Sequence, residues 1–320
     1  MGCLPFYERM LLIRRFEERV AELHRAGQVP GFTHLYWGQE AIAVGVCHWL
    51  RDDDYVLSTH RGHGHCLAKG ADPQRVLAEI MGRATGYCRG KGGSMHVAAF
   101  DRGILGANGI VGASLPIATG VALASQMAGD GRATVVFFGD GAVEEGAFHE
   151  TLNLASLWNL PLLFVCEDNR YAISVPADRR QAGKGAAAIA EADGVEARKL
   201  DGNDVAAMLD AGRWGVAQAR AGKPALLECA TIRWGGHHSA QPTRRYRTNQ
   251  DLQECTDADP VCRIEQRLLA EGEATAEELE RINAEVMAVV ETATRFAQAS
   301  PLPQPREALE DVYVTQEDSR

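Results

Sequence analysis

Two short apolar runs, joined by a helical pattern, constrain the fold of this chain more than any other feature. Thr134–Phe138 and Leu162–Val165 are rich in β-branched and aromatic residues, as buried parallel strands are. The apolar residues between them recur at helical spacing, at Phe148, Leu152, Ala155 and Trp158. Asn159 and Pro161 then end the predicted helix. A strand–helix–strand crossover makes the two strands parallel, so both end at the same edge of a sheet.

Polar residues follow both predicted strands, at the edge where open α/β sheets bind ligands. Gly139-Asp140-Gly141 follows the first strand, and Asp168-Asn169 follows the second about 30 residues later. A carboxylate and an amide oxygen suit Mg²⁺, which takes six oxygens and fills most of its shell with water and phosphate. One nearby backbone carbonyl would complete half the shell, and a diphosphate would supply most of the rest. The glycines let the backbone approach that diphosphate. Taken alone, the Gly-Asp-Gly turn is equally compatible with an incidental aspartate.

The Gly-Asp-Gly, the later asparagine and the helix between them form the thiamine diphosphate motif. From Tyr7 to about Tyr313 the chain resembles the alpha subunit of the thiamine diphosphate-dependent dehydrogenase component of 2-oxo acid (pyruvate or branched-chain) and acetoin dehydrogenase complexes. The resemblance implies an α/β fold: a three-layer, doubly wound parallel sheet of the thiamine diphosphate-binding type, followed by C-terminal helices and a tail. It implies one domain, residues 1–320, with a proline-rich tail from Pro301 that packs back on the body.

Composition narrows the class of protein. A net charge of −10 argues against a nucleic-acid partner, because phosphate neutralisation needs a basic surface. No apolar run approaches the length of a membrane span, and the first residues lack a signal-peptide pattern. The eight cysteines include no Cys-x-x-Cys pair, so we expect reduced thiols in a cytoplasmic protein.

Other elements follow from periodicity and breakers. Further strands are expected at 195–199 and 226–232. Helices are expected at 7–26, 40–50, about 115–127, about 203–220 and within 258–299. Residues 51–112 contain many glycines and histidines but few long apolar runs, which indicates a segment that lines a site. Residues 233–250 are polar and unpatterned, and we expect a loop there.

Arg61 stands among three histidines, His60, His63 and His65. Histidines at this spacing suggest a transition-metal site, but a fixed positive charge beside a cation is costly. Arg61 instead suits a diphosphate through paired, charge-assisted hydrogen bonds. The resemblance implies that His60, in place of a frequent tyrosine, and Arg61 hold the terminal phosphate, and that His63 lies close to the cofactor.

The resemblance also assigns the aminopyrimidine ring and the catalytic histidines. Backbone groups of Gly109 and Val111 would bind the ring, and the Val111 side chain would enforce a bent cofactor. His237 aligns with the active-site histidine of the family, supported by Pro242 and the Tyr246-Arg247 pair. His34 resembles a second channel histidine. We expect His237 to have a pKa near neutrality and to move a proton.

Together these inferences predict two sets of ligands. The cofactor-binding residues are predicted as His60, Arg61, Gly109, Val111, Asp140, Gly141, Ala142, Asn169, Tyr171 and His237. The metal ligands are predicted as Asp140, Asn169 and Tyr171.

The implied reaction is the thiamine diphosphate- and Mg²⁺-dependent oxidative decarboxylation of a 2-oxo acid, with pyruvate favoured, or the cleavage of acetoin. The acyl group would pass to the lipoyl group of a partner acyltransferase, and a beta subunit would complete an α2β2 heterotetramer and supply the glutamate that acts on the pyrimidine. A branched-chain 2-oxo acid is an alternative substrate. After His237 the chain carries His238-Ser239-Ala240-Gln241 where pyruvate-specific members often carry a serine and then an acidic residue. This departure leaves both a regulatory serine and the pyruvate assignment open.

Two rival interpretations rank lower. A nicotinamide- or flavin-binding oxidoreductase needs Gly-x-Gly-x-x-Gly directly after a strand, whereas the chain reads GDGAVEEG after Phe138. A non-catalytic homologue that only binds a partner has no need of Asp140, Asn169, Arg61 and His237 together.

Overall fold

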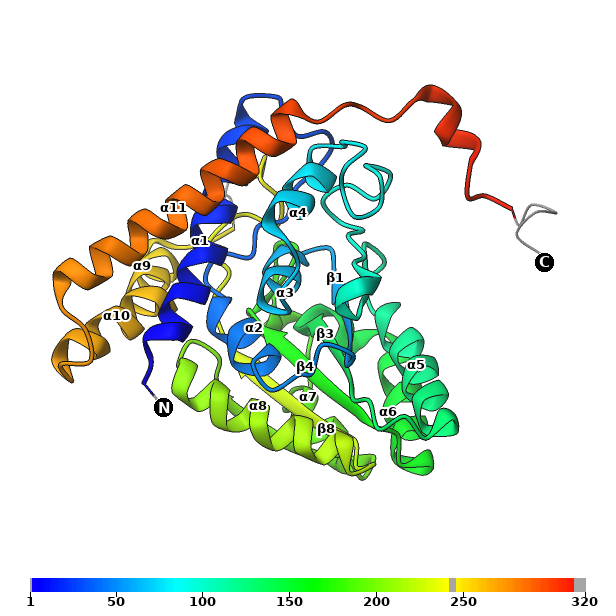
Figure 1. Cartoon of the computed structure of the whole chain (residues 1–320). Helices are drawn as coiled ribbons and strands as arrows, with labels where there is room; N and C mark the ends of the chain where they lie inside the picture. Colours follow the sequence, from blue (N-terminus) through cyan, green and yellow to red (C-terminus); the bar gives the residue numbers. More distant parts are fainter. Residues whose placement is uncertain (1, 242–245, 314–320) are drawn as a thin grey trace.

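A six-stranded parallel sheet forms the centre of the computed structural model, which describes residues 2–241 and 246–313 (Figure 1). The strand order is β2-β1-β3-β4-β8-β7, and each paired neighbour runs parallel. The strands are β1 (Tyr55–Thr59), β2 (Ile104–Asn108), β3 (Thr134–Gly139), β4 (Leu162–Asp168), β7 (Glu196–Asp201) and β8 (Ala225–Ala230). A short antiparallel hairpin of β5 (Tyr171–Ala172) and β6 (Val175–Pro176) follows β4.

Helices cover both faces of the sheet because the central strands are apolar on both sides. Along β3, Val135 and Phe137 belong to one buried cluster, whereas Val136 and Phe138 belong to the other. This alternation is the period-2 geometry of a strand. The three-layer, doubly wound arrangement predicted from the sequence is therefore confirmed.

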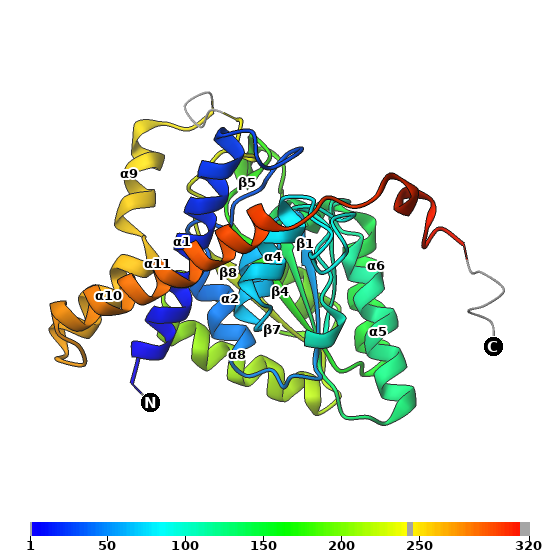
Figure 2. The ribbon, with the colours of Figure 1, turned by 45° about the horizontal axis from the view of Figure 1, so that its top comes forward.

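One face is covered by three helices, which lie to the right of and behind the sheet in Figure 1. They are α5 (Ser114–Ala128), α6 (Gly146–Trp158) and α7 (Ala186–Ala192). The other face carries more helices, with α1 and α11 packed outermost (Figures 1 and 2). They are α1 (Leu4–Arg25), α2 (Glu40–Cys47), α3 (His63–Ala68), α4 (Pro73–Ile80), α8 (Val205–Arg220), α10 (Pro260–Ala270) and α11 (Ala276–Ala299).

Local sequence signals set several helix ends. The carboxylates of Asp204 and Asp259 cap α8 and α10, and Thr275 and Glu278 form a capping box at the start of α11. Asn159 ends α6 in the left-handed conformation, with φ of 53°. The helices and strands predicted by periodicity are present at nearly the predicted bounds.

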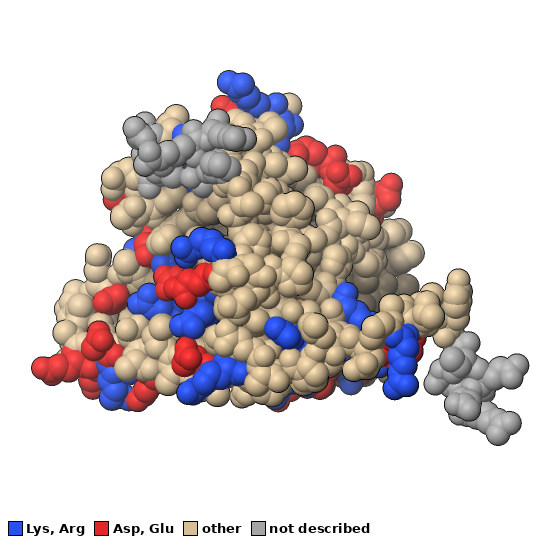
Figure 3. Space-filling view, turned by 90° about the horizontal axis from the view of Figure 1, so that it is seen from above, with Lys and Arg blue, Asp and Glu red and all other residues tan. Residues whose placement is uncertain are grey.

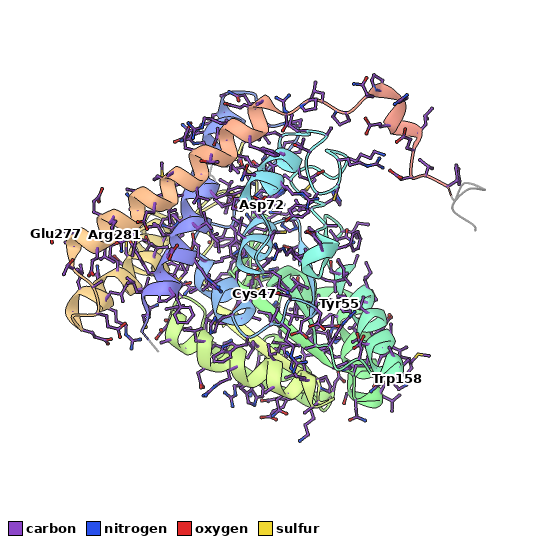
Figure 4. All side chains as sticks on the ribbon, viewed as in Figure 1. Cys47, Tyr55, Asp72, Trp158, Glu277 and Arg281 are labelled. Atoms are coloured by element: carbon purple, nitrogen blue, oxygen red, sulfur yellow. The ribbon has the colours of Figure 1, made fainter. Side chains whose placement is uncertain are left out.

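Two stretches differ from the sequence-based expectation. Residues 51–112 contain β1, β2, α3 and α4, which are short elements without a long apolar run. In the segment expected to be a loop at 233–250, the described residues 233–241 and 246–248 are irregular, and α9 (Asn249–Asp257) begins after them. Trp158, placed on the apolar face of α6 by spacing, is 42% exposed at the end of the helix (Figure 4).

The C-terminal tail, expected to pack back on the body, touches it mainly through polar groups in its described part. Leu302, Leu309 and Tyr313 are exposed, and this part of the tail extends away from the sheet (Figures 1 and 2). Asp311 forms ion pairs with Arg89 and Lys91. Exposed ion pairs of this kind contribute little to stability.

Within residues 2–241 and 246–313, no helix is both long and apolar enough to cross a membrane. The longest described helix, α11, exposes charged residues such as Glu277 and Arg281 along its outer side (Figure 4).

Candidate active site

A pocket of about 230 Å³ opens at the carboxyl edge of the sheet. The chain runs from β1 to β2 on one side and crosses back to β3 on the other, so the ends of β1 and β3 diverge. Open α/β sheets bind ligands at such a switch point. Thr59, Asn108, Asp140 and Asn169, which stand at the ends of β1, β2, β3 and β4, all line the pocket.

Asp140 and Asn169 lie side by side because β3 and β4 pair up to Gly139 and Glu167. Both are buried. The Asn169 side-chain nitrogen donates a 3.1 Å hydrogen bond to Gln39 Oε1, whereas its Oδ1 has no partner among the described residues. An unpaired buried amide oxygen is costly unless a ligand completes it.

The donor set around this oxygen fits a hard divalent cation, which binds carboxylate and carbonyl oxygens. Tyr171, the third predicted ligand, also lines the pocket, and its backbone carbonyl accepts a 3.5 Å hydrogen bond from Arg233 Nη1. A side chain placed at Gly139 would meet no protein atom within 4 Å, so the glycine leaves open space at the strand end. A Cβ at Gly141 would lie 2.9 Å from that of Ala172, so this position must stay a glycine for the hairpin to approach.

Burial raises the pKa of Asp140 to about 6, although the nearby Arg180 guanidinium acts in the opposite direction. The ionised carboxylate is therefore disfavoured by its surroundings. A divalent cation would favour its ionised form.

Arg61 lies buried at the pocket wall and is anchored by backbone carbonyls. Its guanidinium donates hydrogen bonds of 2.6 Å to Leu35 O and 3.0 Å to His237 O. Burial, followed by the positive charge of Arg233, lowers the pKa of Arg61 to about 9. Anchoring by carbonyls holds the charge in place without neutralising it, as an anion site requires.

Three histidines from separate segments meet at the same place. The His34 ring centroid lies 4.7 Å from that of His60 and 4.8 Å from that of His237. Burial, assisted by the Arg61 charge, lowers the pKa values of His34 and His237 to about 3 and that of His60 to about 2. The depressed pKa of His237 differs from the near-neutral value expected from the sequence, and burial is its main cause. Because Arg61 faces all three rings, a further cation among them is opposed.

His63, expected close to the cofactor, is not among the pocket-lining residues. Its Nδ1 contacts Glu17 at 3.0 Å and its Nε2 contacts Ser94 Oγ at 2.9 Å, all in the core. His65 is also buried, between Ser58 and Glu167. These two histidines brace the wall behind the pocket, and only His60 of the three reaches it.

The segment predicted to hold the aminopyrimidine ring stands at the open side of the pocket. Ile110, Val111 and Gly112 line it, whereas Gly109 lies just outside the lining. Ile110 and Val111 are 72% and 50% exposed. The Val111 side chain is therefore placed to contact a ligand, whereas Gly109, predicted to bind the ring through its backbone, is not among the pocket-lining residues.

The structure adds residues that sequence analysis missed. Glu167 and Arg233 line the pocket, Gln39 holds Asn169, and Arg180 pairs with Asp140. Gln39 stands directly before α2, in a Gly-Gln-Glu segment. The two arginines lie in stretches without periodicity, where no local signal distinguishes them from surface charges.

The loop after β8 carries His237 into the site. Arg233 within it donates hydrogen bonds to Ile173 O at 2.8 Å and Tyr246 Oη at 3.0 Å. Ser239 bonds to Thr33 through both its backbone and its hydroxyl. Pro242, used above to align this loop, lies outside the described residues.

Fold and site together define an α/β protein whose sheet carries a pocket at its carboxyl edge, and the residues lining this pocket fit a diphosphate and a divalent cation, the arrangement of thiamine diphosphate-dependent enzymes. The sequence profile of the dehydrogenase E1 component family matches residues 8–306, and the chain belongs to that family. This confirms the resemblance noted from the sequence.

Curated relatives cover almost the whole chain. The alpha subunit of acetoin:2,6-dichlorophenolindophenol oxidoreductase from Bacillus subtilis is 44% identical over 98% of this chain and 94% of its own length. The protein of the same name from Cupriavidus necator is 43% identical, with the same coverage. The alpha subunit of the pyruvate dehydrogenase E1 component from Rhizobium meliloti is 39% identical over 97% of this chain and 90% of its own length.

Proposed function

We propose that this chain is the alpha subunit of an α2β2 enzyme that binds thiamine diphosphate and Mg²⁺ and cleaves a 2-oxo acid or acetoin. The acyl group formed would pass to the lipoyl group of a partner acyltransferase. One observation carries the proposal. The Asn169 side-chain oxygen is buried with no hydrogen-bond partner among the described residues, and Asn169 and Asp140 both line the pocket at the ends of two paired strands. Family membership supplies the cofactor class.

When bound, thiamine diphosphate provides the nucleophilic carbon and the electron sink for breaking a carbon–carbon bond. The chain's own contribution is to hold and orient that cofactor. Asp140, Asn169 and the Tyr171 carbonyl would hold the cation. Backbone groups at Gly141 and Ala142 would approach the diphosphate beside it.

The positive side of the pocket would receive the phosphate end. Arg61 is already fixed by two carbonyls, so little side-chain entropy is lost when an anion arrives. His60 is neutral and can donate one hydrogen bond. At the open side, Val111 would contact the ring end and set the bend of the cofactor.

His237 and His34 would act as neutral hydrogen-bond donors near the substrate. Their depressed pKa values keep both rings uncharged in the cofactor-free state. A neutral imidazole can still orient an incoming carbonyl or lipoyl sulfur and pass a proton from one ring nitrogen.

A partner subunit would cover the open side. Ile110, Val111 and Ile117 expose large apolar side chains beside the pocket or at the start of α5. Seen from above, the centre and right of the molecular face are mostly uncharged, whereas charged side chains lie at the left and around the margins (Figure 3). Apolar anchors inside a weakly charged surface are typical of the centre of an interface.

Two substrate classes are favoured by specific observations. The relatives that are 44% and 43% identical are named for acetoin, and one that is 39% identical is named for pyruvate dehydrogenase. Acetoin and pyruvate are therefore the candidates to compare first, with branched 2-oxo acids as the third.

The cysteines of the described residues form no disulfide with one another, which supports a cytoplasmic protein.

Co-expression with a beta subunit of the same enzyme class tests the proposal. Calorimetry on the α2β2 enzyme should show thiamine diphosphate binding that requires Mg²⁺ and disappears in Asp140→Ala. A panel of pyruvate, branched 2-oxo acids and acetoin, with a lipoyl domain as acceptor, then assigns the substrate. Unchanged cofactor affinity in Asp140→Ala would refute the proposed site.

A further inference from the structure

Each of the two side chains at the proposed cation site has one of its two polar atoms held by a neighbour. Gln39 accepts the hydrogen bond from Asn169 Nδ2, whereas Asn169 Oδ1 has no partner among the described residues. Arg180 forms an ion pair with Asp140 through Oδ2, so Oδ1 is the carboxylate oxygen left to face a cation. The two ligands are therefore oriented in the same manner by different partners.

Arg180 stands directly after the short helical turn Ala177–Arg179, which follows the β5–β6 hairpin. Its side chain is only 10% exposed. Besides the carboxylate, its Nη1 donates a 3.1 Å hydrogen bond to the backbone carbonyl of Asp140. The neighbouring Gln181 side chain donates a second hydrogen bond, also of 3.1 Å, to that carbonyl. The segment thus grips both the backbone and the side chain of one residue.

A positive charge beside a dication is unfavourable, and the structure offsets it. Arg180 Nη1 also contacts Glu144 Oε1 at 2.5 Å, so the guanidinium already has a second carboxylate partner. Together Arg180 and Glu144 are nearly neutral, and a bound diphosphate would bring further negative charge to the site. With its charge offset, the main effect of Arg180 is to orient the carboxylate of Asp140.

We propose that Arg180 is a positioning residue of the cation site: it holds one carboxylate oxygen of Asp140 so that the other points at the metal. This inference rests on the proposed function. Outer contacts of this kind orient metal ligands, and their loss typically weakens metal affinity by about 10- to 100-fold. Arg180 also ties the β5–β6 hairpin, and with it the Tyr171 carbonyl, to the end of β3.

The test measures metal affinity rather than turnover, on the α2β2 enzyme with saturating thiamine diphosphate. Mn²⁺ replaces Mg²⁺ in this experiment. The electron paramagnetic resonance signal of free Mn²⁺ decreases when the ion binds, so the signal gives the bound fraction directly. Arg180→Met should raise the Mn²⁺ dissociation constant by about 10- to 100-fold. Arg180→Lys should recover part of the loss, since an ammonium can hold one oxygen but not the carbonyl as well. Arg179→Met, at the exposed neighbouring position, is the matched control and should bind Mn²⁺ as the wild type does.

The outcomes separate this inference from the proposed function. If wild-type enzyme shows no metal-dependent cofactor binding, the proposed function fails. If the wild type binds Mn²⁺ and Arg180→Met binds it equally well, the positioning role alone is overturned. Tighter Mn²⁺ binding in Arg180→Met would also overturn it, because Arg180 would then be a competitor of the metal. If Arg180→Met does not assemble, the Arg180→Lys enzyme provides the test. A Mn²⁺ affinity equal to that of the wild type would then contradict a role for the two contacts that Arg180 makes with the carboxylate and the carbonyl of Asp140.

Discussion

The guanidinium of Arg61 donates a hydrogen bond of 3.0 Å to the backbone carbonyl of His237, which joins the end of β1 to the loop after β8. The bond uses the main chain of His237 and leaves its imidazole beside His34 and His60. Anchoring of the loop and the chemistry of the side chain are therefore separable by mutation.

We expect His237→Ala to keep cofactor binding and to lower acyl transfer to a lipoyl domain by about 10²- to 10⁴-fold, the usual range for a positioned acid or base. The alanine variant retains the carbonyl that Arg61 holds. A single-turnover assay with free lipoyl domain gives the rate, and calorimetry gives the cofactor affinity. His149→Ala, on the exposed side of α6, is the control. A normal transfer rate in His237→Ala would contradict the assigned role.

The meeting of Asp140 and Asn169, the predicted metal ligands, at one sheet edge was predictable from sequence, because a single crossover makes their two strands parallel. Composition predicts two buried strands, at Thr134–Phe138 and Leu162–Val165. Because the strands are parallel, the residues that follow them lie at the same edge of the sheet. The contact between Arg180 and Asp140 was not predictable. It depends on how the β5–β6 hairpin folds back, and no periodic pattern in the sequence indicates this. The histidine pKa values also escaped prediction, because burial and the approach of Arg61 belong to the folded chain alone. In residues 51–112, short elements are held by tertiary contacts and carry no pattern of sufficient length.

Acid should destabilise the cofactor-free protein partly through His60. Its pKa is about 2 in the folded state, against 6.5 for an unperturbed histidine. Between these values only the unfolded chain binds the proton, so stability is full above pH 6.5 and falls as the pH is lowered. From pH 6.5 to 5 the loss from this group is about 2 kcal/mol.

His60→Tyr removes this titrating group, so the free energy of unfolding should fall less as the pH is lowered. The measurement is the thermal midpoint of the cofactor-free α2β2 enzyme at pH 7.5 and pH 5, for wild type and variant. The variant should lose less on acidification than the wild type. Parallel losses in both proteins would show that His60 is not held neutral by the fold.

Metal binding should weaken in acid because a proton competes for Asp140. With the Asp140 pKa raised to about 6, the carboxylate is mostly ionised at pH 7 and mostly protonated at pH 5. The apparent Mg²⁺ dissociation constant should rise about tenfold per pH unit below pH 6 and level off above neutrality. Calorimetric titrations from pH 5 to 8, corrected for the titration of free thiamine diphosphate, measure this. A constant affinity across that range would mean that the folded protein keeps Asp140 ionised.

The wall behind the pocket depends on a glycine. Gly64 lies on α3, and a Cβ there would collide with the ring of Tyr36, which is fully buried and hydrogen-bonded to the pocket residue Glu167. Gly64→Ala should therefore destabilise the enzyme by about 1–3 kcal/mol through overpacking and displace Glu167. Gly146→Ala is the matched control, because a Cβ at this first residue of α6 meets nothing within 4 Å. That control should be neutral or stabilising by up to about 1 kcal/mol. The prediction is tested by measuring the thermal midpoint and the cofactor affinity of both α2β2 variants. A Gly64→Ala enzyme with wild-type values of both would show that the Tyr36 ring can move aside.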